Sequence, residues 1–211
     1  MNYLAHVALS QNDPELILGN MLGDFVPLSR INNYPPRVSL GIKLHKAIDR
    51  FTDSHPVFLH SKSHIRDDYR ILKGVMVDIF YDHFLAVKWD NYYQEPLSAA
   101  CQNFYAVFCS NLSLVPERLQ KMLPRLVSEN WFVSYGTLEG INWVLNGLSG
   151  RLSRPNLLGS GIGELKEHYQ KFSEDFDKFY PELQSFVVHW LRQNSTNGIN
   201  QNIPPKPAGL L

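Results

Sequence analysis

Three residues that can bind a metal ion or move protons lie in a segment with the pattern of a buried helix. The segment VDIFYDHFLAVKW, residues 77–89, places Asp78, Asp82 and His83 among apolar side chains. Asp78 and Asp82 are one helical turn apart, and His83 lies about 100° further round the helix. A buried carboxylate costs free energy unless a cation or hydrogen-bond donors compensate its charge. The pattern therefore raises the question of what compensates these two aspartates.

A second group with the same chemistry occurs in KLHKAIDRFTD, residues 43–53. His45, Asp49 and Asp53 follow one another at intervals of four residues, so they share one face of a helix. Asp24 stands in LGDFV, where the first apolar helix is expected to end. Carboxylates that face one another repel unless they are protonated or bridged by a cation. A divalent metal ion would bridge them, and mixed His and Asp ligands favour Mn²⁺, Mg²⁺ or Fe²⁺ over a structural zinc.

An ordinary structural role explains each of these residues equally well when it is taken alone. A single aspartate commonly caps a helix or pairs with a neighbouring cation, here Lys46 or Arg50. A single histidine such as His6 or His83 is commonly a hydrogen-bonded residue of the core. From the residues alone, both the metal site and the structural roles remain open.

The elements that must position these residues are helices almost throughout, because the apolar positions follow helical periodicity and no strand-like alternation is long enough to build a sheet. Asp13 and Pro14 are typical of a helix start. Helices are expected over residues 13–23, 39–54, 57–69, 72–89, 96–110, 116–128 and 137–149, with a final pair over 162–192 broken near Pro181. The sequence predicts an all-α single domain over residues 1–193. Residues 194–211 are polar and rich in proline, and are expected to form a flexible tail.

Charge is balanced over the whole chain but not along it. The 20 basic and 20 acidic residues give a net charge of zero, which argues against a nucleic-acid-binding protein. Residues 30–73 contain nine basic and four acidic residues, so this stretch carries +5. Such a stretch either attracts an acidic partner or forms a solvated surface.

Composition predicts a cytoplasmic protein. The two cysteines, Cys101 and Cys109, form no metal-binding or disulfide pattern, which suits a reducing compartment. The first residues have no basic and apolar leader pattern, and no apolar run approaches the roughly 18 residues of a membrane span. No membrane association is expected.

Five segments resemble the acyl carrier protein phosphodiesterase family, also called acyl carrier protein hydrolases. They are MNYLAHVALS, GNMLGDFV, GIKLHKAID, VDIFYDHFLAVKW and INWVLNGLSGR, and the resemblance covers roughly residues 1–190. It implies a cytoplasmic, HD-like helical bundle that uses Mn²⁺. The implied reaction removes 4′-phosphopantetheine from holo acyl carrier protein and returns the apo form.

The residue pattern, together with the reaction that this resemblance implies, gives an expected role for each candidate residue. The expected metal ligands are Asp24, His45, Asp78, Asp82 and His83. The expected catalytic groups are His6, Asp49 and Lys46. Either His6 or a metal ion assists the leaving serine, and Asp49 acts as a base or orients His45. Lys46 either contacts the phosphate or forms an ion pair with Asp49 or Asp53. The expected contacts with the carrier protein are Arg50, Arg66 and Arg70.

Two other functions fit the same residues. One is an HD-like phosphohydrolase that acts on a nucleotide or another small phosphate, although such a substrate needs no broad basic surface. The other is a helical module that binds acyl carrier protein without catalysis. No expected carboxylate or histidine is missing from the sequence, which favours the enzyme.

Overall fold

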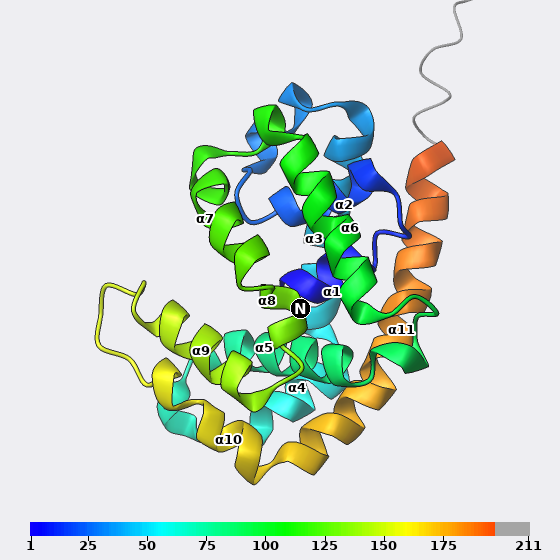
Figure 1. Cartoon of the computed structure of the whole chain (residues 1–211). Coiled ribbons are helices and arrows are strands. Elements are labelled where there is room, and N and C mark those ends of the chain that lie inside the picture. Colours follow the sequence, from blue (N-terminus) through cyan, green and yellow to red (C-terminus); the bar gives the residue numbers. More distant parts are fainter. Residues whose placement is uncertain (197–211) are drawn as a thin grey trace, which may run out of the picture.

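The computed structural model describes residues 1–196, and this range contains helices and no strands (Figure 1). The α-helices are α1 Tyr3–Ala8, α2 Pro14–Leu22, α3 Pro36–Ser54, α4 Pro56–Ser63, α5 Leu72–Val87, α6 Leu97–Ser110, α7 Glu117–Ser128, α8 Trp131–Ser134, α9 Leu138–Ser149, α10 Ile162–Glu167 and α11 Tyr169–Thr196. Short 3₁₀ turns lie between them at Leu28–Asn33, Asp67–Tyr69, Trp89–Asn91, Leu112–Leu114 and Leu158–Ser160. The expected all-α domain is confirmed.

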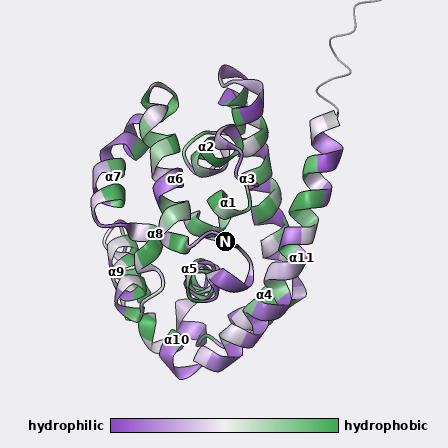
Figure 2. Ribbon diagram, turned by 45° about the vertical axis from the view of Figure 1, so that its right-hand side comes forward, coloured by the Kyte–Doolittle hydropathy of each residue, from purple (hydrophilic) through white to green (hydrophobic). Residues whose placement is uncertain are grey.

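The short helix α1 lies at the centre of the bundle. It packs against α2 on one side and α5 on the other, while the long helix α11 runs beside α3, α4 and α5 (Figures 1 and 2). All of α1 from Leu4 to Ala8 is buried, including His6. A histidine on this helix therefore points into the protein wherever it faces.

Helices α2 and α3 cross in very close contact because glycine occupies the crossing point on both. A Cβ atom on Gly19 would overlap the carbonyl oxygen of Val38 and lie 2.8 Å from the Cα of Gly41. A Cβ on Gly41 would in turn lie 2.7 Å from the carbonyl oxygen of Leu16. This crossing holds the end of α2 against the middle of α3.

Aromatic side chains join α5 to α11 in the other half of the core. The rings of Phe80 and Phe172 meet edge to face at 5.1 Å, and those of Phe84 and Tyr169 at 4.9 Å. Rings packed in this way contribute about 0.5–1.5 kcal/mol per pair beyond their buried area. The pairs fix α5, which carries Asp78 and Asp82, relative to the C-terminal helix.

Several helix boundaries differ from the expected ones. Helix α3 begins at Pro36 instead of residue 39, because proline is well accommodated at a first helical position. The expected helix 57–69 ends at Ser63, and the chain becomes extended at Arg66. The final pair is broken at His168, and Pro181 lies inside α11. A helix can cross a proline at the cost of one backbone hydrogen bond when tertiary packing holds both halves.

The expected C-terminal tail lies mostly outside the described residues. Helix α11 extends to Thr196, and residues 197–211 are not part of the described range. No helix among residues 1–196 is long and apolar enough to cross a membrane.

Candidate active site

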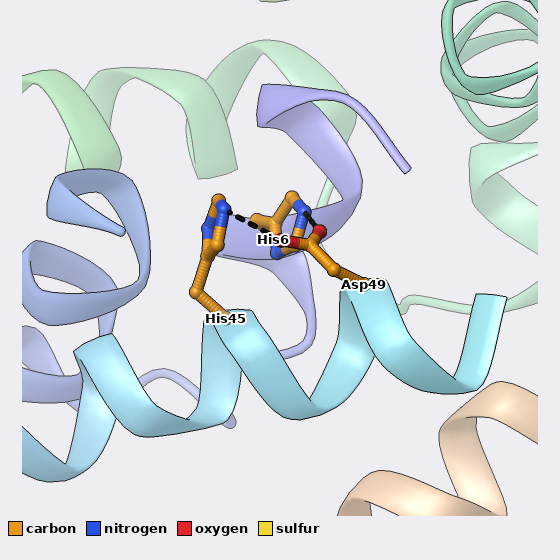
Figure 3. A group of neighbouring side chains, drawn as sticks. All are labelled: His6, His45 and Asp49. Carbon is orange, nitrogen blue, oxygen red and sulfur yellow. Dashed lines mark ion pairs between the residues drawn. The ribbon is translucent and has the colours of Figure 1, made fainter. Parts of the chain in front are cut away.

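His45 projects from the middle of α3 toward the end of α2. Its Nδ1–H donates to the carbonyl oxygen of Asn20 over 2.8 Å. This bond fixes the ring orientation and leaves Nε2 facing two carboxylates, Asp24 at 3.1 Å and Asp49 at 3.3 Å. Figure 3 shows His45 and Asp49 on the same face of α3. The ring fits here because residue 23 is glycine: a Cβ on Gly23 would overlap it. The expected sharing of a face by His45 and Asp49 is observed.

His6 reaches the same place from α1. Its ring stacks on that of His45 with centroids 3.8 Å apart, and its Nε2 lies 3.2 Å from Asp49 (Figure 3). The amide nitrogen of Asn20 donates to the carbonyl oxygen of His6 and to Ser10, so the amide oxygen faces the Nδ1 of His6 at 3.0 Å. Nδ1–H is therefore the donor, and Nε2 faces two oxygen atoms, that of the Met1 carbonyl at 3.1 Å and that of Asp49.

Asn20 thus orients both imidazoles, one through its backbone carbonyl and one through its side chain. Histidines that bind metals usually donate their other ring N–H to an oxygen in this way. Asn20 was not among the residues expected from the sequence. It is a fully buried amide in the otherwise apolar stretch LILGNML, which is the signal that could have found it.

Lys46 lies beside the two carboxylates. Its Nζ is 3.6 Å from Asp49 and 3.9 Å from Asp24, and its side chain is partly exposed. We call His6, His45, Asp24 and Asp49 the imidazole cluster. The ammonium group balances part of the negative charge on its solvent-exposed side. Of the expected catalytic and ligand residues, the structure brings together His6, Asp24, His45, Lys46 and Asp49.

The protonation of the cluster follows from burial and from its carboxylates. Burial alone would lower the pKa of His45, but the hydrogen bonds with Asp24 and Asp49 outweigh it and raise this pKa to about 9. Burial, together with the charge on His45, lowers the pKa of His6 to about 4. Burial would raise the pKa of Asp24 and Asp49, but their hydrogen bonds with His45 hold both below the ordinary value. At neutral pH His6 is neutral, and His45 must release a proton before its Nε2 can bind a cation.

Asp82 has a different environment. One carboxylate oxygen accepts from the backbone N–H of Leu4 at 2.8 Å, and the other from that of Ala5 at 3.3 Å. These N–H groups belong to the first turn of α1, which has no side-chain cap of its own. A carboxylate at a helix N-terminus is stabilised by the free N–H groups and by the helix dipole. Asp82 thereby caps α1, and these hydrogen bonds offset part of the cost of its burial, which still raises the pKa of Asp82 to about 7.

The structure also places Asp78 and His83 outside the imidazole cluster. Asp78 accepts from the amino nitrogen of Met1 at 2.6 Å. The Nδ1 of His83 meets the carbonyl oxygen of Tyr135 at 2.7 Å, and its Nε2 meets the hydroxyl of Tyr169 at 2.9 Å. These two contacts occupy both ring nitrogens of His83.

A cavity of about 570 Å³ opens beside the cluster. Four carboxylates line it, those of Asp24, Asp49, Asp53 and Asp78. Its apolar wall consists of Val75, Ile79, Trp131, Trp143, Val144 and Leu148, and its cations are Arg125 and Arg151. The volume falls within the roughly 300–1,000 Å³ of small-molecule sites. The two arginines were not expected from the sequence, because their contribution depends on how α9 packs against α5 and how α7 packs against α8.

The three arginines expected at a carrier-protein surface are all exposed. Arg66 forms an ion pair with the buried carboxylate of Glu164, with Nε 2.6 Å from the oxygen. Neither Arg50 nor Arg70 has an ion pair with any residue of the described chain. Of these three arginines, Arg50 and Arg70 therefore keep a charge that no ion pair within residues 1–196 compensates.

A family model described as acyl carrier protein phosphodiesterase matches residues 1–183. The chain belongs to the acyl carrier protein phosphodiesterase family. A family member of that name from Yersinia pestis is 32% identical over 190 residues, which cover 90% of this chain and 98% of the relative. Another, from Photorhabdus laumondii, is 31% identical over 184 residues, covering 87% and 93%. A third, from Salmonella agona, is 32% identical over 186 residues, covering 88% and 96%. No solved structure matches this chain significantly.

Family membership confirms the resemblance seen in the five sequence segments. The matched region includes the whole of the imidazole cluster, from His6 to Asp49, and the cavity up to Arg151. The cluster and cavity are therefore the candidate active site of a member of this family.

Proposed function

We propose that the protein hydrolyses the phosphodiester that joins 4′-phosphopantetheine to a serine of holo acyl carrier protein, producing the apo form. The observation that carries this proposal is the pair of stacked imidazoles between two carboxylates, at one side of a cavity in a chain of this family. Phosphodiester cleavage requires a site that stabilises negative charge on the phosphoryl oxygens and activates water. The cluster has the residues for both.

The donor set fits a divalent metal ion. His6, His45 and Asp49 offer ligand atoms that all lie within 4.8 Å of one another, and Asp24 adds an oxygen 3.1 Å from His45. Two neutral nitrogens and two carboxylates suit Mn²⁺, with Mg²⁺ and Fe²⁺ as alternatives. When bound, such an ion polarises a phosphoryl oxygen and lowers the pKa of a coordinated water. We assign His6, with its lowered pKa, to this ligand set instead of to proton donation.

Three groups of the chain complete the reaction. Asn20 holds both imidazoles in the orientation in which their Nε2 atoms would face a bound cation. The ammonium group of Lys46 contacts a phosphoryl oxygen or the serine oxygen as negative charge develops there, because it already lies beside Asp24 and Asp49. The apolar wall of the cavity accepts the pantetheine arm, and Trp131 and Trp143 offer large rings against which it packs.

The test is incubation of the purified protein with holo acyl carrier protein and Mn²⁺, followed by intact-mass measurement of the carrier protein. Loss of the phosphopantetheine mass is the expected result, and chelation of the metal is expected to prevent it. A panel of nucleotides and simple phosphate esters serves as the comparison. Hydrolysis of these esters without loss of the carrier-protein prosthetic group would instead indicate a small-molecule phosphohydrolase. Binding of the carrier protein without any hydrolysis would indicate a non-catalytic module.

Charge reversal at Arg151 and at Arg70 should weaken the encounter with an acidic carrier protein. Arg151 lines the cavity and Arg70 is exposed in the basic stretch. Charges at the rim of an interface chiefly change the association rate. Arg70→Glu and Arg151→Glu are each expected to lower kcat/KM by about tenfold, to leave kcat within about twofold, and to flatten its dependence on ionic strength.

Lys178→Glu is the matched control, because Lys178 is an exposed cation of α11 outside the cavity and outside the basic stretch. It should leave kcat/KM nearly unchanged. Equal losses in all three variants would mean that only net charge matters, and that the basic stretch is a solvated surface.

A further inference from the structure

A second group of metal-binding side chains lies outside the cavity and shares no residue with the candidate active site. It consists of His60 of α4, His64 at the C-terminal cap of α4, and Asp175 of α11. Their ligand atoms all lie within 4.8 Å of one another. The mechanism proposed above uses none of the three.

The geometry of this group is that of a preformed site. His60 and His64 are four residues apart, so both rings leave the same face of the chain. The Nδ1 of His60 lies 3.0 Å from one oxygen of Asp175, and the Nε2 of His64 lies 3.2 Å from the same oxygen. The two rings meet edge to face with centroids 4.6 Å apart. Two nitrogens therefore converge on one carboxylate from a single helical turn.

Asp175 is anchored and the group is open to solvent on one side. The carboxylate is almost completely buried, and Ser61 donates its hydroxyl to it over 2.8 Å. Ser61 in turn contacts the hydroxyl of the buried Tyr81. The side chain of His60 is 62% exposed. A metal ion can therefore enter from solvent on the side of His60, and the buried carboxylate of Asp175 provides a fixed oxygen ligand.

We propose that His60, His64 and Asp175 bind a transition-metal ion of the Zn²⁺ type that joins α4 to α11. Two imidazoles and one carboxylate are a common protein set for zinc, with water in the fourth position. Nitrogen-rich sites favour Zn²⁺ over Mn²⁺ in affinity. The ion replaces the hydrogen bonds that the two rings donate to Asp175, and ties the C-terminal helix to the preceding half of the bundle.

This proposal is independent of the catalytic one, and its test uses zinc alone as the probe. The full-length wild type, His60→Ala and His189→Ala proteins are each incubated with zinc and passed through gel filtration. The zinc that remains bound is then measured by elemental mass spectrometry. His189 is an exposed histidine of α11 outside this group, so its replacement is the matched control. His60→Ala is expected to bind one zinc ion fewer than wild type, and His189→Ala as many as wild type.

Zinc should also stabilise the protein through this site. At about a hundredfold excess over Kd, the increase in Tm is expected to be roughly 5–10 °C larger in wild type than in His60→Ala. NMR of the histidine rings in the wild type provides a measurement that needs no variant: zinc should shift the ring signals of both His60 and His64. Equal zinc contents in His60→Ala and His189→Ala would overturn the site. A shift of His60 without any shift of His64 would overturn the proposed pair of imidazole ligands.

Discussion

His45→Gln is expected to lower the rate of conversion of holo to apo acyl carrier protein on the order of a thousandfold or more. The substitution removes the Nε2 atom that faces Asp24 and Asp49. It also removes the Nδ1–H group that donates to the carbonyl oxygen of Asn20. Asp49→Asn should have a similar effect, because its carboxylate is the one that both imidazoles contact. Turnover is measured by intact mass of the carrier protein, and bound metal by elemental analysis of the same samples.

His83→Gln is the matched control, since the sequence alone placed His83 among the ligands and the structure places it against Tyr135 and Tyr169. It is expected to retain its metal and to reduce turnover by no more than about tenfold, through loss of packing alone. Loss of metal in His83→Gln together with full metal content in His45→Gln would contradict the ligand set proposed here. It would place the metal ion at His83 and not at the imidazole pair.

Asp82→Ala is expected to lower the free energy of unfolding by about 2–4 kcal/mol, with or without Mn²⁺. The substitution leaves the N–H groups of Leu4 and Ala5 buried without an acceptor and removes the only carboxylate that caps α1 within the described chain. Turnover should fall as well, because α1 carries His6. Denaturant unfolding of the metal-free and of the Mn²⁺-loaded protein measures the free energy of unfolding in each state.

The two possible roles of Asp82 make opposite predictions for metal. As a helix cap, Asp82 can be removed while Mn²⁺ still raises the Tm by as much as in wild type. As a ligand, its removal would abolish that increase. Asp53→Ala is a suitable control for stability, because Asp53 is exposed and its replacement should cost no more than about 0.5 kcal/mol. An unchanged unfolding free energy in Asp82→Ala, together with loss of the Mn²⁺ effect, would establish Asp82 as a ligand.

The helices and one part of the site could be predicted from the sequence because both depend on local geometry. Apolar periodicity is a property of neighbouring turns, so most helices were placed within a few residues. The error at Pro36 arose because proline fits the first position of a helix, and the error at Pro181 because tertiary contacts hold α11 on both sides of the proline. His45 and Asp49 were paired correctly, since residues four apart on one helix meet whatever the rest of the fold does.

Contacts between distant segments were decided by the tertiary structure alone. The glycine crossing of α2 and α3 brings Asp24 and Asn20 to His45, and the burial of α1 brings His6 to the same point. Spacing along the chain contains no information about such distances.

The aspartates of α5 show the same limit. The sequence determined that Asp78 and Asp82 share one face of a helix among apolar residues, and that something must compensate their charge. It did not determine what compensates it. The structure supplies the N–H groups of α1 for Asp82 and the amino nitrogen of Met1 for Asp78. A buried carboxylate accepts a hydrogen bond from a backbone N–H as readily as it binds a cation, so only the arrangement of the helices in space decides between the two.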